Sequence, residues 1–191
     1  MKKLFLMGRS EAGKTSLTQV LKGEELHYHK TQYTNTGTDI IDSPGEYSET
    51  KRCGLGLACC ALNPGLINRA AILYPFLSDF KLVWDLGADE IAYEGIRYYA
   101  RWFDADEHQQ DRWFRQLGYI DSKNFATLVQ CPVLFGTGLE DVICPPQTQC
   151  AVYNNLHCKK KRYLFPGYGH EEIAEFDDML LDFFCKEEAV L

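Results

Sequence analysis

The stretch "IDSPGEYSETKRCGLGLACCALNP", residues 41–64, decides the fold, because two different α/β patterns meet in it. Its left half begins with Ile41, the last apolar residue of the run "TDIID", followed by Asp-Ser-Pro-Gly, which is typical of a strand that ends in a tight turn. Its right half carries small and apolar residues at helical spacing and stops before Pro64, which predicts a helix. We therefore expect one α/β segment to give way to another at about residues 48–52.

Strand and helix patterns alternate on both sides of this stretch. Apolar runs predict five strands, at 2–7, 38–42, 67–76, 131–138 and 161–167. Periodic apolar positions between them predict helices, and a final helix over 171–184 closes the chain. This alternation predicts an α/β fold: a three-layer sandwich with a mostly parallel sheet of about five strands and helices on both faces.

Residues 76–130 are too many for a single crossover between the third and fourth strands. Aromatic and apolar side chains recur at helical spacing there and predict extra helices: Trp102, Phe103, Trp113, Phe114 and Leu117. Two arrangements are open, a cap over a site and helices packed on the sheet.

Composition limits the class of protein. With 191 residues, 46% of them hydrophobic, we expect one compact domain over 1–191, made of a 1–50 segment and a 51–191 segment. A net charge of −7 argues against general binding to nucleic acid or anionic membranes. Apolar runs are too short for a signal peptide or a membrane span, so we expect a cytoplasmic protein. The eight cysteines form no C-x-x-C pair and are expected to be small buried hydrophobes.

A phosphate-binding motif stands at the start of the chain. Residues 8–15, "GRSEAGKT", match G-x-x-x-x-G-K-[ST] at every fixed position, between a predicted strand and a predicted helix. Backbone N–H groups of a loop that includes Gly8 and Gly13 would surround a phosphate. Lys14 would reach the β- and γ-phosphates, and the Thr15 hydroxyl would bind Mg²⁺.

A second motif follows at the end of the second predicted strand. Asp42-Ser43-Pro44-Gly45 has the D-x-x-G form of nucleotide-sensing switches. Asp42 would hold the magnesium shell, and the Gly45 N–H would sense the γ-phosphate. The two motifs together predict a nucleoside triphosphate with Mg²⁺ as cofactor and a nucleotide or phosphate as ligand.

"GRSEAGKTSL", "GEELHYHKTQ" and "IDSPGEY" together resemble the start of the EutP/PduV family, over about the first 50 residues. That family comprises small Ras-like P-loop proteins of ethanolamine- and propanediol-utilisation microcompartments. The resemblance implies phosphate and magnesium binding by Lys14 and Thr15, with a switch-like loop over 31–38. The guanine-reading motif [NT]-K-x-D is absent from the sequence, so the base that would be preferred stays open.

Different chemistry is indicated downstream. Asp141 follows the fourth predicted strand in "GTGLEDVICPP", and His170 follows the fifth in "FPGYGHEE". An acid and a histidine after neighbouring strands, in this order, match the last two members of an α/β-hydrolase triad. Asp141 would orient the imidazole, and His170 would act as general base. Each also has a simpler interpretation, as a cap or a turn residue.

The flanking segments "LYPFLSDF", "RQLGYIDSKNFATLVQCPVL", "GLEDVICPPQT" and "AVYNNL" resemble the acetyl xylan esterase/cephalosporin C deacetylase family. The resemblance covers roughly residues 53–184. It implies an α/β-hydrolase ancestry and activity on small acetyl esters, with Asp141 and His170 in the triad positions.

The nucleophile of that family is missing from its expected place. The family carries G-x-S-Q-G-G before the helix that "LGLACCAL" matches, which puts Thr50 at the serine position and Lys51 at the glutamine. Without flanking glycines the strained nucleophile elbow is not encoded. Thr50, Ser48 and Cys53 are therefore poor candidates for the nucleophile.

Three hypotheses remain open at this point. The chain is a nucleotide-binding protein, an acetyl-ester hydrolase with a substitute nucleophile, or a chimera of two α/β fragments that folds without efficient activity. Parallel α/β fragments can be joined this way if right-handed crossovers are kept. Because the P-loop residues are intact and the serine is not, the sequence favours nucleotide binding with weak or absent turnover.

Overall fold

A computed structural model describes the backbone of residues 4–6, 35–36 and 40–42, and residues 52–76, 78–106 and 108–185. Its strands are β1 (Leu4–Leu6), β2 (Asn35–Thr36), β3 (Ile40–Asp42), β4 (Ala70–Leu73), β5 (Val133–Gly138) and β6 (Lys160–Phe165). Its helices are α2 (Arg52–Leu62), α3 (Phe80–Asp85), the 3-10 turn η2 (Ile91–Tyr93), α4 (Glu94–Phe103), α5 (Gln110–Leu117), α6 (Ser122–Ala126), α7 (Pro146–Asn155) and α8 (Ala174–Cys185).

The described strands form two sheets of three. β4, β5 and β6 pair in parallel in the order β4-β5-β6, while β1 and β3 pair in parallel with β2 antiparallel to β3. The α/β class and the parallel sheet are confirmed, and all five expected strands are present. A single sheet of about five strands is not observed, because the strands of the N-terminal segment pair with one another.

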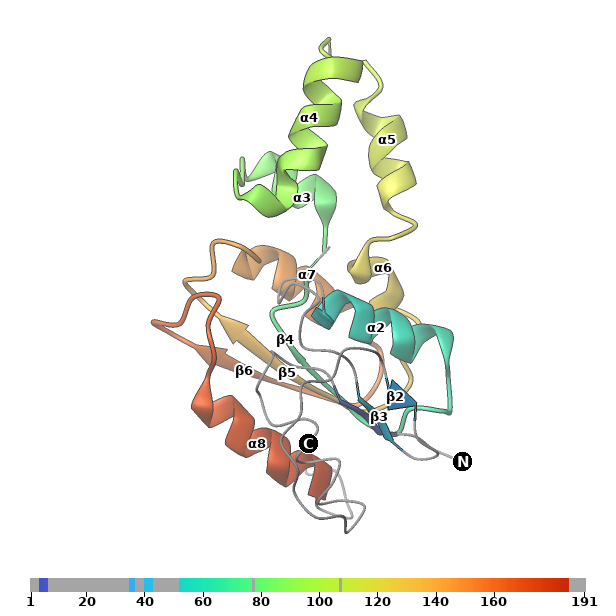
Figure 1. The fold of residues 1–191 in the computed structure, drawn as a ribbon, viewed down its shortest axis with the longest axis vertical. Coiled ribbons are helices and arrows are strands. Elements are labelled where there is room, and N and C mark those ends of the chain that lie inside the picture. The colour runs from blue at the N-terminus through green and yellow to red at the C-terminus, as the bar shows by residue number, and fades with distance from the viewer. Residues whose placement is uncertain are drawn as a thin grey trace.

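Helices cover both faces of the β4-β5-β6 sheet, which makes the expected three layers (Figure 1). On one face, Phe135 of β5 packs with Leu57 of α2 and Val152 of α7 in a fully buried cluster. On the other face, Leu134 packs with Phe176 of α8. All six residues of β5 are buried, Thr137 among them, as expected of a central strand covered on both faces.

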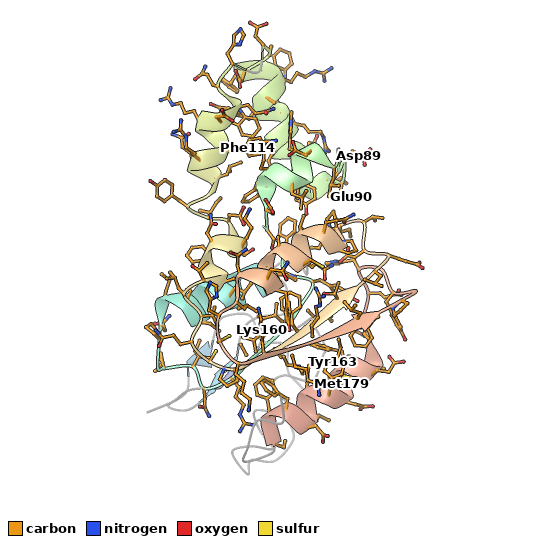
Figure 2. All side chains as sticks on the ribbon, turned by 180° about the vertical axis from the view of Figure 1, so that it is seen from behind. Asp89, Glu90, Phe114, Lys160, Tyr163 and Met179 are labelled. Carbon is orange, nitrogen blue, oxygen red and sulfur yellow. The ribbon has the colours of Figure 1, made fainter. Side chains whose placement is uncertain are left out.

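Figure 2 shows the molecule from behind, with α8 below the β4-β5-β6 sheet. Tyr163 of β6 and Met179 of α8, both labelled there, pack against the buried cluster around Phe176. Phe114 of α5 lies well away from this sheet, in the upper helical part.

Small residues in α2 let this helix pack closely against the chain that follows β4. At Gly54 the approach is closest, because a Cβ there would lie 2.3 Å from the Phe76 carbonyl oxygen. The helix ends at Leu62, before Pro64, as predicted. The last helix, α8, begins three residues later than predicted, and Ile173 at its start is buried as the pattern requires.

The segment between β4 and β5 folds into the extra helices that the sequence predicts. The Asp121 carboxylate caps α6 through the Lys123 N–H at 2.9 Å and also accepts the N–H groups of Asp79 and Phe80, so that it joins α3 to α6.

Beyond this junction α4 and α5 run side by side and project away from the sheet (Figure 1). Asp104, between them, accepts the indole N–H of Trp113 at 2.9 Å and the N–H of Gln109. It is a buried hydrogen-bond acceptor that ties the two helices together.

Candidate functional site

The candidate site lies at the carboxyl ends of β5 and β6. The two strands are parallel neighbours whose last residues, Gly138 and Phe165, are in register. The loop after β5 is tied to the loop after β6, because the Leu139 N–H donates to the Phe165 carbonyl at 3.1 Å and the Glu140 N–H to that of Tyr168 at 2.9 Å. Loops at this edge of a parallel sheet are where ligands bind in α/β folds.

Gly138 allows this close contact between the two loops. A Cβ at this position would lie 2.7 Å from the carbonyl oxygen of Tyr168 and 2.8 Å from that of Gly169. Both distances are shorter than any side-chain carbon normally makes to a backbone oxygen, so only glycine fits here.

Asp141 and His170 meet in this place. The His170 Nδ1 lies 2.9 Å from the Asp141 Oδ2, and this hydrogen bond joins a fully buried carboxylate to an imidazole that is 13% exposed. The other oxygen, Oδ1, accepts the N–H groups of Ile143 at 2.9 Å and Cys144 at 2.8 Å. Because a carboxylate only accepts, Nδ1 carries the proton, and Nε2 of the neutral ring is left as a proton acceptor.

Two further side chains hold the pair. The Gln149 Nε2 on α7 donates to the Asp141 Oδ2 at 3.1 Å. Tyr74, directly after β4, packs its ring against His170 with the centroids 4.9 Å apart and the planes tilted by 38°. Tyr74 has a positive φ of 53°, which is rare for an aromatic residue and found where surrounding structure enforces it. Burial, with a smaller contribution from the Asp141 charge, raises the pKa of the Tyr74 phenol.

The same place brings together three groups able to bind a metal. One donor atom each from Asp141, Cys144 and His170 lie within 4.8 Å of one another. Both carboxylate oxygens already accept hydrogen bonds, and Nδ1 faces Oδ2 at hydrogen-bonding distance. A cation there would have to displace these bonds, so the arrangement favours proton transfer over metal binding.

The structure describes few of the remaining predicted site residues. Gly8, Gly13, Lys14, Thr15 and Gly45 lie outside the described residues, and so do Ser48 and Thr50. The backbone of Asp42 is described, as the last residue of β3 opposite Leu6 of β1. For Cys53 the structure describes the backbone, near the start of α2.

Sequence patterns did not single out Gln149, Tyr74 or Gly138. Gln149 lies eight residues after Asp141, a separation that matches no motif, and its contact depends on how the loop turns into α7. Gly138 falls within a predicted strand. A glycine at the end of that strand, three residues before a predicted catalytic acid, is the one sequence signal that could have indicated a close backbone contact there.

Two family models match the chain, each over one of its segments. The family model for acetyl xylan esterase (AXE1) matches residues 46–187. The chain belongs to the acetyl xylan esterase family. The family model described as "Ethanolamine utilisation - propanediol utilisation" matches residues 1–72, further than the first 50 residues. The two matches overlap over 46–72, so the chain joins segments of two families, as the opening stretch predicts.

Solved acetyl xylan esterases have the same fold. Acetyl xylan esterase 1 from Thermoanaerobacterium sp. JW/SL YS485 is 44% identical with a TM-score of 0.66, and that from Paenibacillus sp. R4 is 30% identical with a TM-score of 0.65. Each comparison covers 69% of this chain and 41% of the esterase.

Curated relatives match parts of the chain as well. The propanediol utilization protein PduV of Citrobacter freundii is 53% identical over 84 residues, 42% of this chain and 56% of PduV. The acetyl esterase Axe7A of Xylanibacter ruminicola is 34% identical over 59 residues, 31% of this chain and 13% of Axe7A. The chain thus spans about half of PduV and less than half of each esterase. None of the described helices is long and apolar enough to cross a membrane.

Proposed function

We propose that residues 46–187 supply the acid–base half of an acetyl-ester hydrolase, with His170 as general base and Asp141 as the residue that orients it. The observation that carries this proposal is the 2.9 Å contact between Nδ1 and Oδ2 at the ends of two adjacent parallel strands. Its support is the esterase family match over the same residues, 46–187.

In this proposal the base acts on water, because the serine elbow is not encoded before α2. Nε2 of His170 takes a proton from a water molecule while the water oxygen bonds to the acetyl carbonyl carbon. The tetrahedral intermediate then breaks its bond to the alkoxy oxygen, which receives the proton from the imidazolium. Acetic acid and an alcohol are the products, and proton transfer of this kind contributes about 10²–10⁴-fold. Turnover is accordingly weak.

Hydrolysis of p-nitrophenyl acetate tests this role. Because any accessible imidazole catalyses this reaction, the matched control is His157→Ala, which removes an exposed histidine outside the site. We expect His170→Ala and Asp141→Asn to reduce the rate by at least about a hundredfold, the lower end of what a general base contributes, and His157→Ala to change it little. Equal rates for His170→Ala and His157→Ala would refute the role of His170.

As a second function we propose binding of a nucleoside triphosphate with Mg²⁺ at the N-terminal segment. The intact G-x-x-x-x-G-K-[ST] motif over 8–15 and the family match over 1–72 support it. Lys14 would contact the β- and γ-phosphates, Thr15 and Asp42 would bind Mg²⁺, and Gly45 would sense the γ-phosphate.

Titration with a fluorescent GTP analogue and Mg²⁺ tests this second function. Lys14→Ala should weaken binding at least about tenfold, the loss expected from one charged hydrogen bond. Lys161→Ala removes the same charge from β6 and should not affect binding. Superimposable curves for the unsubstituted chain and Lys14→Ala would refute the proposal.

A further inference from the structure

Gln149 is a buried amide beside the proposed acid–base pair. It lies in the first half of α7 and is 0% exposed. Its Nε2 donates to the Asp141 Oδ2 at 3.1 Å and to the Cys144 carbonyl oxygen at 2.6 Å. One side chain of α7 therefore holds both the carboxylate and the backbone of the loop that carries it.

The orientation of this amide follows from its neighbours. Oδ2 of Asp141 and the carbonyl oxygen of Cys144 only accept hydrogen bonds, so the NH₂ group has to face both. A flipped amide would place Oε1 against a carboxylate and a carbonyl oxygen. The observed orientation leaves Oε1 buried without a hydrogen-bond partner among the described residues.

The unpaired Oε1 lowers stability, whereas the two hydrogen bonds from Nε2 keep two buried acceptors satisfied. For the site, the important bond is the one to Asp141, where Gln149 provides a second donor to Oδ2. A carboxylate oxygen has two lone pairs in its plane, so the Gln149 bond and the two backbone bonds to Oδ1 fix the carboxylate with the remaining lone pair toward His170.

We infer that Gln149 is a positioning residue that holds the Asp141 carboxylate in the rotation that His170 needs to keep its proton on Nδ1. This role rests on the proposed general-base function of His170. Gln149 touches no reacting atom. It acts through Asp141, and its removal loosens the Asp141–His170 hydrogen bond.

The Nδ1 proton of His170 gives a direct readout. In the full chain labelled with ¹⁵N-histidine, its resonance is assigned by its loss in His170→Ala, and its exchange with water reports how firmly the hydrogen bond is held. We expect exchange about tenfold faster in Gln149→Met and Gln149→Leu, the effect of one lost hydrogen bond to a charged group. Their melting temperatures should fall, because both substitutions also remove the donor to the Cys144 carbonyl oxygen, so the exchange rate is the readout that decides.

Thr148→Val is the matched control. It removes a buried hydrogen bond from the same helix, to the Pro145 carbonyl at 2.8 Å, and within the described part of the chain Thr148 makes no hydrogen bond to Asp141. Its exchange rate should equal that of the unsubstituted chain. The inference fails if exchange is unchanged in the two Gln149 variants, if Thr148→Val accelerates it equally, or if neither Gln149 variant folds.

The outcome separates this inference from the proposed function. A protected Nδ1 proton that depends on Gln149, in a chain without His170-dependent ester hydrolysis, would support the positioning role and refute the function. Absence of the protected proton from the unsubstituted chain would refute both.

Discussion

Replacement of Gly138 by alanine tests whether the site depends on close contact between two loops. The added Cβ would lie 2.7 Å from the Tyr168 carbonyl oxygen, where ordinary contact begins at 3.4 Å. The difference means that the loop carrying His170 has to move by about 0.7 Å, at an overpacking cost of about 1–3 kcal/mol. A shift of that size directed along the Nδ1–Oδ2 line would lengthen the contact from 2.9 Å to about 3.6 Å, which is no longer a hydrogen bond.

Urea unfolding and p-nitrophenyl acetate hydrolysis measure the two consequences. For Gly138→Ala we expect a loss of stability in the stated range and a rate close to that of His170→Ala. Gly95→Ala in α4 is the control, because its Cβ would meet nothing within 4 Å and alanine favours a helix by about 0.5–1 kcal/mol. A Gly138→Ala protein with unchanged stability and an unchanged rate would refute the argument from loop contact.

Two further predictions concern the helical segment between β4 and β5. Tyr93 donates its phenol O–H to the Ile143 carbonyl at 2.6 Å, and burial raises the pKa of this phenol above its ordinary value of about 10. A raised pKa means that the folded state holds the proton more tightly. The stabilisation is present below about pH 10 and is lost as the pH rises above it. Tyr93→Phe should therefore lower the free energy of unfolding by about 1 kcal/mol at pH 7 and make it fall less steeply as the pH rises, measured by urea unfolding from pH 7 to 11. An unchanged dependence on alkaline pH would contradict this. Asp104→Ala removes the acceptor of the Trp113 indole N–H and should cost about 2–3 kcal/mol and shift tryptophan fluorescence, whereas a fluorescence spectrum and a melting temperature like those of the unsubstituted chain would contradict the buried contact.

The proximity of Asp141 and His170 could be predicted because it depends on topology that the sequence encodes. Asp141 and His170 each follow an apolar run, and parallel strands place such residues at one edge of a sheet. The prediction needed only the order of strands and the chemistry of an acid and a histidine. The same reasoning predicted α2 and its end before Pro64, since proline cannot continue a helix.

The contacts that complete the site could not be predicted in the same way. Gln149 reaches Asp141 because of the rotation of α7, which depends on how the loop after Cys144 turns. The partition of strands between two sheets was also missed. An apolar run indicates a strand but not its partner, so the pairing of Leu6 with Asp42 rather than across the junction is a tertiary result.

The most direct test of the central claim is the tautomer of His170. Long-range ¹H–¹⁵N correlation spectra of the neutral imidazole show which nitrogen carries the proton, with His170→Ala for assignment. The 2.9 Å contact to Asp141 predicts the Nδ1–H tautomer in the unsubstituted chain, with Nε2 unprotonated, and its loss in Asp141→Ala. A dominant Nε2–H tautomer in the unsubstituted chain would show that Asp141 does not orient His170, and the acid–base site would be refuted.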